Sequence, residues 1–159
     1  MKTITAQSIA ELAARAAELP RQRSNINLHP ELSDPIQRMV AAGQPGSYVR
    51  PHRHSAPGRW ELFCLLAGEL DLLIFDAKGV VQDRVRLRQG GTAIVEIPHD
   101  CWHSLLFMAK DSAGLELKPG PYAPSEDKDF AAWAPAEGQP GAAELLAWMR
   151  EAVPGSRWR

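Results

Sequence analysis

The chain has 159 residues and a formal net charge of −1, from 18 basic and 19 acidic side chains. This length suits a single domain with a sizeable core. The charge balance argues against nucleic acid or a membrane surface as a partner, and no apolar run approaches the roughly 20 residues of a membrane span. Cys64 and Cys101 make no disulfide framework, so we expect a reducing cytoplasm.

Residues 1–22 are predicted to form an N-terminal helix that covers one end of a β-structure. Ser8 and Glu11 have the spacing of a capping box, and Pro20 ends the helix. Apolar side chains recur at helical spacing between these two signals. The apolar positions are Ile9, Leu12, Ala13, Ala16 and Leu19.

The next segment, residues 21–32, is polar and irregular. Asn25, Asn27 and His29 alternate, so a short strand would present all three on one face, whereas a capped loop is the competing interpretation. Residues 34–43 are compatible with one helical turn or with a strand. In either case we expect Ile36, Met39 and Val40 to pack inward.

From residue 48 onward the pattern is typical of an all-β sandwich or barrel, in which short strands are separated by glycine turns. Residues 62–67 and 70–75 flank Gly68 and Glu69, which predicts a tight hairpin. Further strands are expected at residues 80–87, 92–97, 102–109 and 114–118. Residues 23–118 therefore form the expected barrel.

Residues 119–159 are expected to add a strap and a second helix. Residues 119–124 are rich in proline and glycine, and residues 135–141 resemble a linker. A helix is predicted over residues 142–152, with Leu145, Leu146 and Met149 on one face. Pro154 and Gly155 end it.

Four residues form the strongest candidate site. His52 and His54 are two positions apart, so on an extended strand both imidazoles point the same way. Glu61 opens the next apolar run, which lets it meet both imidazoles across a hairpin. His103 comes later, on a strand whose following alternate residues are apolar. Three imidazoles and one carboxylate suit one divalent transition metal, namely Zn, Fe, Mn or Ni.

These positions resemble the two sequence motifs of the cupin superfamily. The residues that correspond to the first motif are Gly46, His52, His54, Glu61 and Gly68, with six residues between the second histidine and the glutamate. The residues that correspond to the second motif are Gly91, Pro98 and His103. In that second motif Asp100 and Phe107 stand where cupins usually have glycine and asparagine.

Residues 23–135 are more closely similar to the WbuC family of cupin-fold metalloproteins. The segments that carry this resemblance are 23–29, 34–38, 48–54, 60–63, 120–122 and 127–135. The resemblance implies an antiparallel jelly-roll barrel with short terminal helices. It also implies a link to surface-polysaccharide synthesis, because the family occurs with such gene clusters.

A ligand pocket is expected above the metal. Leu105 and Phe107 share the face of His103 and would form an apolar wall. Arg23, Arg38, Arg50 and Lys118 can line the mouth and bind an anionic group, although each can equally be solvated surface. Trp60 can stack on a ligand or fill the core. The resemblance favours a ligand-binding role for Asn27 and His29 over a capped loop. For Tyr122 the resemblance is the only reason to expect such a role.

Three functions remain open from the sequence. The leading hypothesis is a metal-dependent enzyme acting on a small polar molecule, such as a sugar or nucleotide-sugar intermediate, a substrate class that the resemblance implies. Isomerase, epimerase, lyase and Fe(II) dioxygenase chemistry all suit such a site. The second is a non-catalytic module in which the metal anchors a ligand, because one fold hosts many functions. The third is a metal-free scaffold.

A homodimer is also expected. Leu62, Cys64 and Leu66 lie on the strand face opposite Glu61, Phe63 and Leu65, and both sets are largely apolar. A strand that is apolar on both faces is covered on both faces. A second subunit, a second sheet or a terminal helix can provide that cover.

Overall fold

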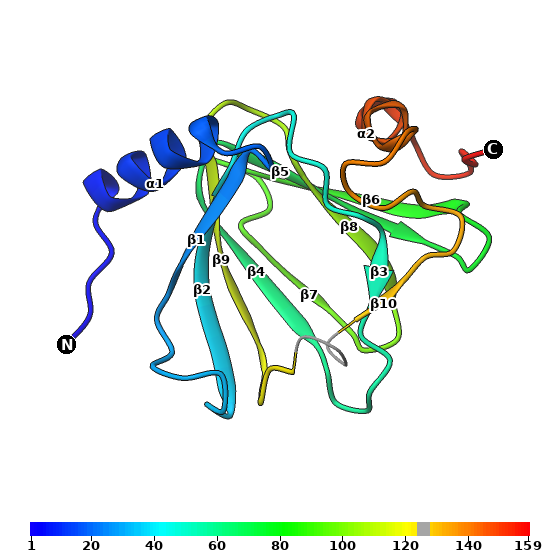
Figure 1. The fold of residues 1–159 in the computed structure, drawn as a ribbon. Coiled ribbons are helices and arrows are strands. Elements are labelled where there is room, and N and C mark those ends of the chain that lie inside the picture. Colours follow the sequence, from blue (N-terminus) through cyan, green and yellow to red (C-terminus); the bar gives the residue numbers. More distant parts are fainter. Residues whose placement is uncertain (124–127) are drawn as a thin grey trace.

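A computed structural model describes residues 1–123 and 128–159. Within this part of the chain, two five-stranded antiparallel sheets face each other and a helix flanks each (Figure 1). The elements are α1 (Ala6–Glu18), β1 (Arg23–Asn27), β2 (Ile36–Gly43), β3 (His52–Arg53), β4 (Glu61–Ala67), β5 (Glu69–Phe75), β6 (Val81–Arg88), β7 (Ile94–Ile97), β8 (Trp102–Phe107), β9 (Ser112–Pro119), β10 (Asp129–Phe130) and α2 (Ala142–Glu151).

The strand order is β1-β2-β9-β4-β7 in the first sheet and β10-β3-β8-β5-β6 in the second. This arrangement confirms the predicted mainly-β jelly-roll barrel with a short helix near each end of the chain. Parts of the expected strap and of the WbuC-like segments fall on residues 124–127, outside the described residues. Neither helix in the described part of the chain is long and apolar enough to cross a membrane.

The predicted hairpin at Gly68 is wrong. β4 pairs with β7 and β9 in the first sheet, whereas β5 pairs with β6 and β8 in the second. Gly68 has a φ of 68°, and a Cβ there would clash with Ser112. The Ser112 hydroxyl accepts the N–H of Glu69 at 3.1 Å. The chain therefore passes from one sheet to the other here, a corner that local sequence does not distinguish from a hairpin.

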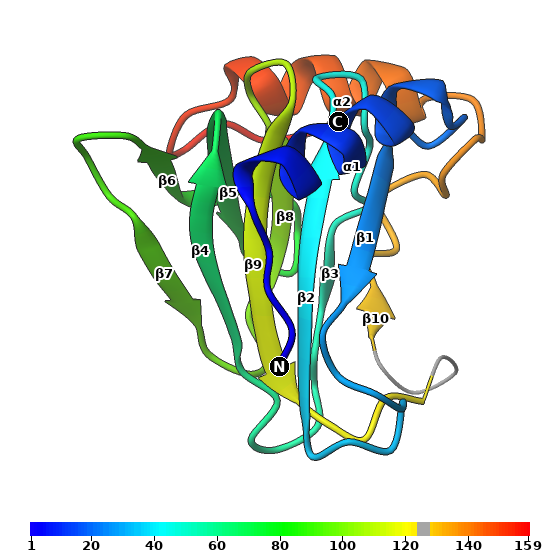
Figure 2. The same ribbon diagram turned by 90° about the vertical axis from the view of Figure 1, so that its left-hand side faces the viewer.

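Helix α1 lies across the outer face of the first sheet (Figure 2). Its N-cap is Thr5, whose hydroxyl accepts the N–H of Ser8 at 3.1 Å while the Ser8 hydroxyl accepts the N–H of Thr5 at 3.4 Å. The predicted cap at Ser8 is wrong because Ser8 already lies in the first turn. Leu12 and Ala13 pack against buried residues of β2 and β9, as expected of an amphipathic helix.

Residues 36–43 form a strand rather than a helical turn. Alternation along β2 separates the residues that were expected to pack inward. Met39 faces the space between the sheets, whereas Val40 packs beneath α1. The same alternation places Gln37 on the interior side, where it is 1% exposed.

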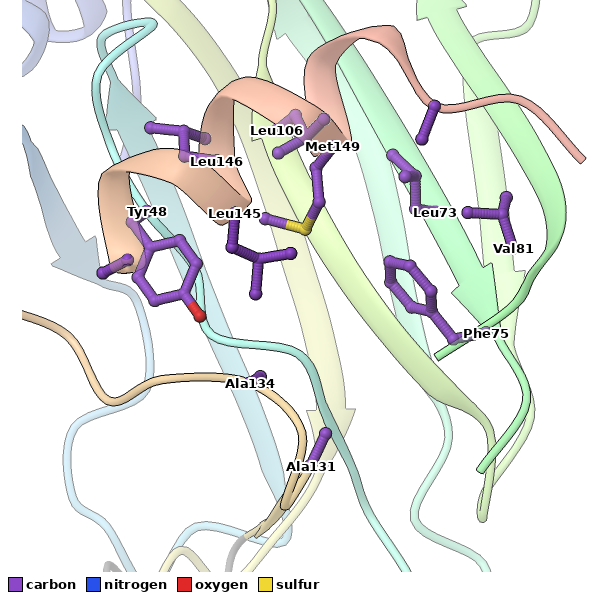
Figure 3. Packing of buried hydrophobic residues seen from close by; sticks show 12 residues of the cluster. Tyr48, Leu73, Phe75, Val81, Leu106, Ala131, Ala134, Leu145, Leu146 and Met149 are labelled. Carbon is purple, nitrogen blue, oxygen red and sulfur yellow. The ribbon is translucent and has the colours of Figure 1, made fainter. Parts of the chain in front are cut away.

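Within the described residues, one apolar core lies between the sheets, a second lies outside the second sheet, and a third lies between α1 and the first sheet. The inner core includes Phe63 of β4 and Phe107 of β8. The outer core is the packing of α2 on β5, β6 and β8, where Leu145 and Met149 are fully buried against Leu73 (Figure 3). Each sheet thus has a helix on its outer face, which leaves the space between the sheets for the candidate site.

Candidate metal centre

The four predicted ligands come together between the two sheets. His52 lies on β3, His54 follows that strand directly, His103 lies on β8, and Glu61 opens β4 on the facing sheet. All four are buried, and each offers one donor atom such that the four atoms lie within 4.8 Å of one another. The expected convergence is present, but it forms across two sheets rather than across a hairpin.

Backbone carbonyls orient two of the imidazoles. Nδ1 of His52 lies 2.9 Å from the carbonyl oxygen of Arg50, and Nδ1 of His103 lies 2.9 Å from that of Cys101. Because a carbonyl oxygen only accepts, each Nδ1 carries the proton and donates it. In the neutral form of each ring, Nε2 then keeps its lone pair. Metal-binding histidines are usually held in this way.

Glu61 faces two of the imidazoles. Its Oε1 lies 3.0 Å from Nε2 of His54, and its Oε2 lies 2.9 Å from Nε2 of His103. Within the described residues, Oε2 of Glu61 and Nε2 of His103 are buried and approach each other without hydrogen-bond geometry. Buried polar atoms normally have a partner, and a cation between these lone pairs would supply one.

Burial and neighbouring groups hold His52 and Glu61 in the forms that bind metals. Burial and then the proximity of His103 lower the pKa of His52 well below 6.5, so its imidazole is neutral. Burial alone would raise the pKa of Glu61, but His103 and His54 outweigh it and hold that pKa well below its ordinary value. Neutral imidazole and ionised carboxylate are the ligating forms, so the donor set fits one divalent transition metal.

His52, Glu61 and His103 line a cavity of about 390 Å³. Part of its wall is apolar, and polar side chains from β1 and β9 make up much of the rest. The apolar side chains of the wall include Met39, Val49, Phe63, Leu105 and Phe107. Apolar walls with a few placed polar groups are typical of small-molecule sites.

Four of the predicted ligand-binding residues reach this cavity, namely Arg23, Asn27, His29 and Tyr122. The alternation predicted for β1 places Asn25 beside Asn27, and the Asn25 amide donates to Oδ1 of Asn27 at 2.6 Å. His29 is buried, and its Nδ1 accepts the backbone N–H of Arg38 at 2.9 Å. His29 therefore lines the cavity, and a hydrogen bond from β2 holds it in place.

The other three predicted binding residues lie outside the wall of this cavity, as far as the structure describes it. Arg38 alternates with the interior residues of β2 and pairs with Asp34 at 2.9 Å. Arg50 donates to two backbone carbonyls of the segment before α2, at 2.9 and 3.2 Å, and lines an adjoining cavity of about 350 Å³. Trp60 is half-buried immediately before β4.

Glu116 and Lys118 of β9 complete the polar wall. Nζ of Lys118 lies 3.5 Å from Oε1 of Glu61 and 3.7 Å from Oε1 of Glu116. Burial and then the charge of Glu61 raise the pKa of Glu116 to about 7. Sequence reasoning expects Lys118 only at the mouth and does not find Glu116. The signal is the alternation of these two polar residues with Leu115 and Leu117, because the polar set faces inward.

Similarity to solved structures identifies the fold. An oxalate oxidase in complex with the substrate analogue glycolate has a TM-score of 0.55 at 14% identity, covering 84% of this chain and 75% of its own. A cupin superfamily protein from Desulfitobacterium hafniense gives 0.50 at 17%, covering 68% and 86%. CapF with the inhibitor 3-isopropenyl-tropolone gives 0.58 at 15%, covering 71% of this chain and 32% of CapF. Fold and site together define a cupin-fold protein with a His₃Glu candidate metal centre.

The family follows from the sequence itself. The family described as a domain of unknown function, DUF6016, matches residues 4–87, which is more than half of the chain. The chain belongs to DUF6016. No curated protein matches it. The matching family is not WbuC, so the resemblance to that family continues only as a proposal.

Proposed function

We propose that this protein is a metal-dependent enzyme acting on a small polar molecule. The observation that carries the proposal is the convergence of three buried imidazoles and one buried carboxylate, three of them in the wall of a cavity of about 390 Å³. A metal that accepts five or six ligands would keep a position for a substrate or for water beside these four residues. The cavity supports the proposal because three of the four donor residues, His52, Glu61 and His103, form part of its wall.

The division of labour among the residues follows from the cavity wall. A metal held by His52, His54, Glu61 and His103 would supply Lewis acidity and a template for the substrate. Phe63, Leu105 and Phe107 would exclude water. The polar residues of β1 and β9 would orient the substrate. Isomerisation, epimerisation and elimination suit such a site, as does dioxygen chemistry if the metal is Fe(II).

The substrate class proposed is a sugar or a nucleotide-sugar intermediate of surface-polysaccharide synthesis, in a cytoplasmic setting. Its support is the resemblance of residues 23–135 to the WbuC family. Arg23, Asn27, His29 and Tyr122 would contact the part of the substrate beside the metal. Arg50 would contact a longer substrate through the adjoining cavity. Arg38 and Trp60 stay outside this proposal.

The test is a turnover assay on protein loaded separately with Zn, Fe, Mn or Ni, with a panel of sugars and nucleotide sugars. Product formation that depends on one metal and is lost in His54→Ala is the expected result. His99→Ala is the matched control, because His99 is exposed, is not among the four converging donors and does not line the cavity. Tight binding without turnover under every metal would instead indicate a metal-anchored binding module.

We also propose that the protein is a homodimer. Leu62 and Cys64 of β4 are half-buried on the outer face of the first sheet, and Ile94 beside them on β7 is 55% exposed. Helix α1 packs on Leu66 at the far end of β4. A second copy would cover the remainder of this apolar face.

A further inference from the structure

The inner face of β9 carries two charged residues beside the candidate metal centre. Glu116 and Lys118 alternate with Leu115 and Leu117, and both line the cavity. Glu116 lies opposite Met39 of β2 and Phe63 of β4 in the sheet register, so it is flanked by apolar side chains. Neither residue belongs to the four converging donors. Burying two charges here costs stability, which points to a role in binding.

The ammonium group of Lys118 lies between two carboxylates. Its Nζ is 3.5 Å from Glu61 and 3.7 Å from Glu116, and the residue is 5% exposed. The ring of Tyr122 lies 5.4 Å from the same nitrogen. A ligand that reaches the metal position beside Glu61 therefore comes within reach of Lys118 and Glu116.

The charge of the cavity wall favours an anionic ligand. The wall contains four cationic side chains, from two arginines and two lysines, and two carboxylates, from Glu61 and Glu116. Glu137 at the adjoining cavity adds a third carboxylate, which pairs with Arg21 at 2.9 Å and Arg23 at 2.7 Å. Four positive charges then stand against at most three negative charges, since Glu116 has a pKa of about 7 and is partly protonated at neutral pH, before a divalent metal adds two more. A ligand that brings negative charge would reduce this excess.

The positions of the charges favour a carboxylate over a phosphate as the anionic group of the ligand. The ammonium of Lys118 contacts Glu61 and is flanked by two carboxylates, and Lys128 is close enough to lower the pKa of His52. A phosphate dianion there would face repulsion from Glu61 and from the ionised fraction of Glu116, and phosphate sites usually offer a bidentate arginine or a helix N-terminus. A monoanionic carboxylate needs only one such partner. Asn25 and Asn27 at the mouth, with Glu116 inside, offer donors and acceptors for hydroxyl groups.

We infer, on the basis of the proposed metal-dependent function, that the ligand is a small hydroxy acid whose carboxylate binds Lys118 and whose hydroxyl groups bind Glu116. A charged hydrogen bond of this kind contributes roughly 1.5–3 kcal/mol, or about a ten- to hundredfold change in affinity. The effect of the ligand's charge on affinity and the effect of its hydroxyl groups can therefore be measured separately.

The test is calorimetry on wild-type protein loaded with Zn(II), using four probes. Gluconate carries a carboxylate and hydroxyls, glucitol only hydroxyls, hexanoate only a carboxylate, and glucose 6-phosphate a phosphate with hydroxyls. Gluconate should bind at least about tenfold more tightly than each of the other three. Equal binding of glucitol or hexanoate would overturn the inference, and so would tighter binding of glucose 6-phosphate.

Two variants assign the residues. Lys118→Met should remove the preference for gluconate over glucitol, and Glu116→Gln should reduce the preference for gluconate over hexanoate. Lys78→Met and Glu96→Gln are matched controls, because both residues are exposed and lie away from the cavity. Lys118→Gln also removes the charge and tests the same point if the methionine variant does not fold, whereas Lys118→Arg keeps the charge and should retain the preference. Preferences that persist in both folded site variants would contradict the assignment.

Metal content separates this inference from the function on which it rests. Both site variants should keep the zinc content of the wild type, measured by mass spectrometry. A wild type that holds no metal would defeat the proposed function. A wild type that holds metal but does not distinguish the probes would defeat only the hydroxy-acid inference.

Discussion

The buried carboxylate of Asp71 accepts a hydrogen bond of 2.6 Å from Nε of Arg84, and the same guanidinium caps the end of α2. Arg84 donates to the carbonyl oxygens of Ala152 at 2.7 Å and Arg150 at 2.8 Å. Arg86 adds a second guanidinium to Asp71 at 2.8 Å. A cation at a helix C-terminus is favourable, so this group joins the second sheet to the helix that covers it.

Asp71→Ala should lower the free energy of unfolding by about 3 kcal/mol, because it leaves Arg84 largely buried without its carboxylate. Urea denaturation measures the loss. Glu151→Ala, at an exposed carboxylate of α2, is the control and should change stability by less than about 0.5 kcal/mol. Similar stabilities for the two variants would contradict a structural role for the Asp71–Arg84 pair.

The contribution of Asp71 to the free energy of unfolding should be lost in acid. Burial alone would raise the pKa of Asp71, but hydrogen bonds from Arg86 and Arg84 outweigh it and lower that pKa from 3.8. A lowered folded-state pKa gives stability that is complete above the unfolded-state value and is lost as the pH falls through the folded-state value. The stability difference between wild type and Asp71→Ala should therefore be smaller at pH 3 than at pH 6. An equal stability difference at both pH values would contradict the lowered pKa of Asp71.

Leu145→Ala should destabilise the protein by about 2–5 kcal/mol, because the side chain is fully buried between α2 and the second sheet (Figure 3). Chemical denaturation measures the change. Leu19→Ala is the matched control, since Leu19 is 39% exposed just beyond α1. A loss below about 1 kcal/mol for Leu145→Ala would indicate that α2 packs loosely.

Metal content should fall in His52→Ala and His54→Ala and remain unchanged in His99→Ala. Elemental analysis of the purified proteins makes the comparison. Metal should also leave on acidification, because protons compete for the Nε2 atoms of the ligating imidazoles. Unchanged stoichiometry in both site variants, or full retention at pH 4, would rule out histidine ligation.

Sedimentation velocity at micromolar concentration should show a dimer that Leu62→Asp converts to a monomer. The aspartate places a charge on the apolar outer face of β4. Leu32→Asp, at a residue that is 50% exposed between β1 and β2, is the control and should remain dimeric. A monomeric wild type would show that this apolar face needs no second subunit.

The sequence was sufficient wherever a pattern is local. Alternation with glycine turns predicted the β class, and the apolar spacing of Leu145, Leu146 and Met149 predicted the buried face of α2. The spacing of His52 and His54 predicted two imidazoles on one side of a strand. In each case the period of the backbone sets the direction of the side chain, so neighbours along the chain carry the information.

Only the tertiary structure decided which strands meet. Apolar runs on both sides of Gly68 suit a hairpin and a corner equally well, because the choice depends on pairing with β7, β8 and β9, which lie far along the chain. The same pairing brings Glu61 from one sheet to His103 on the other, and places Glu116 and Lys118 beside them. By itself, then, the sequence determined the class of the fold and the candidate ligands. The packing of the two sheets decided the remaining wall of the site, because contacts between distant segments have no local signature.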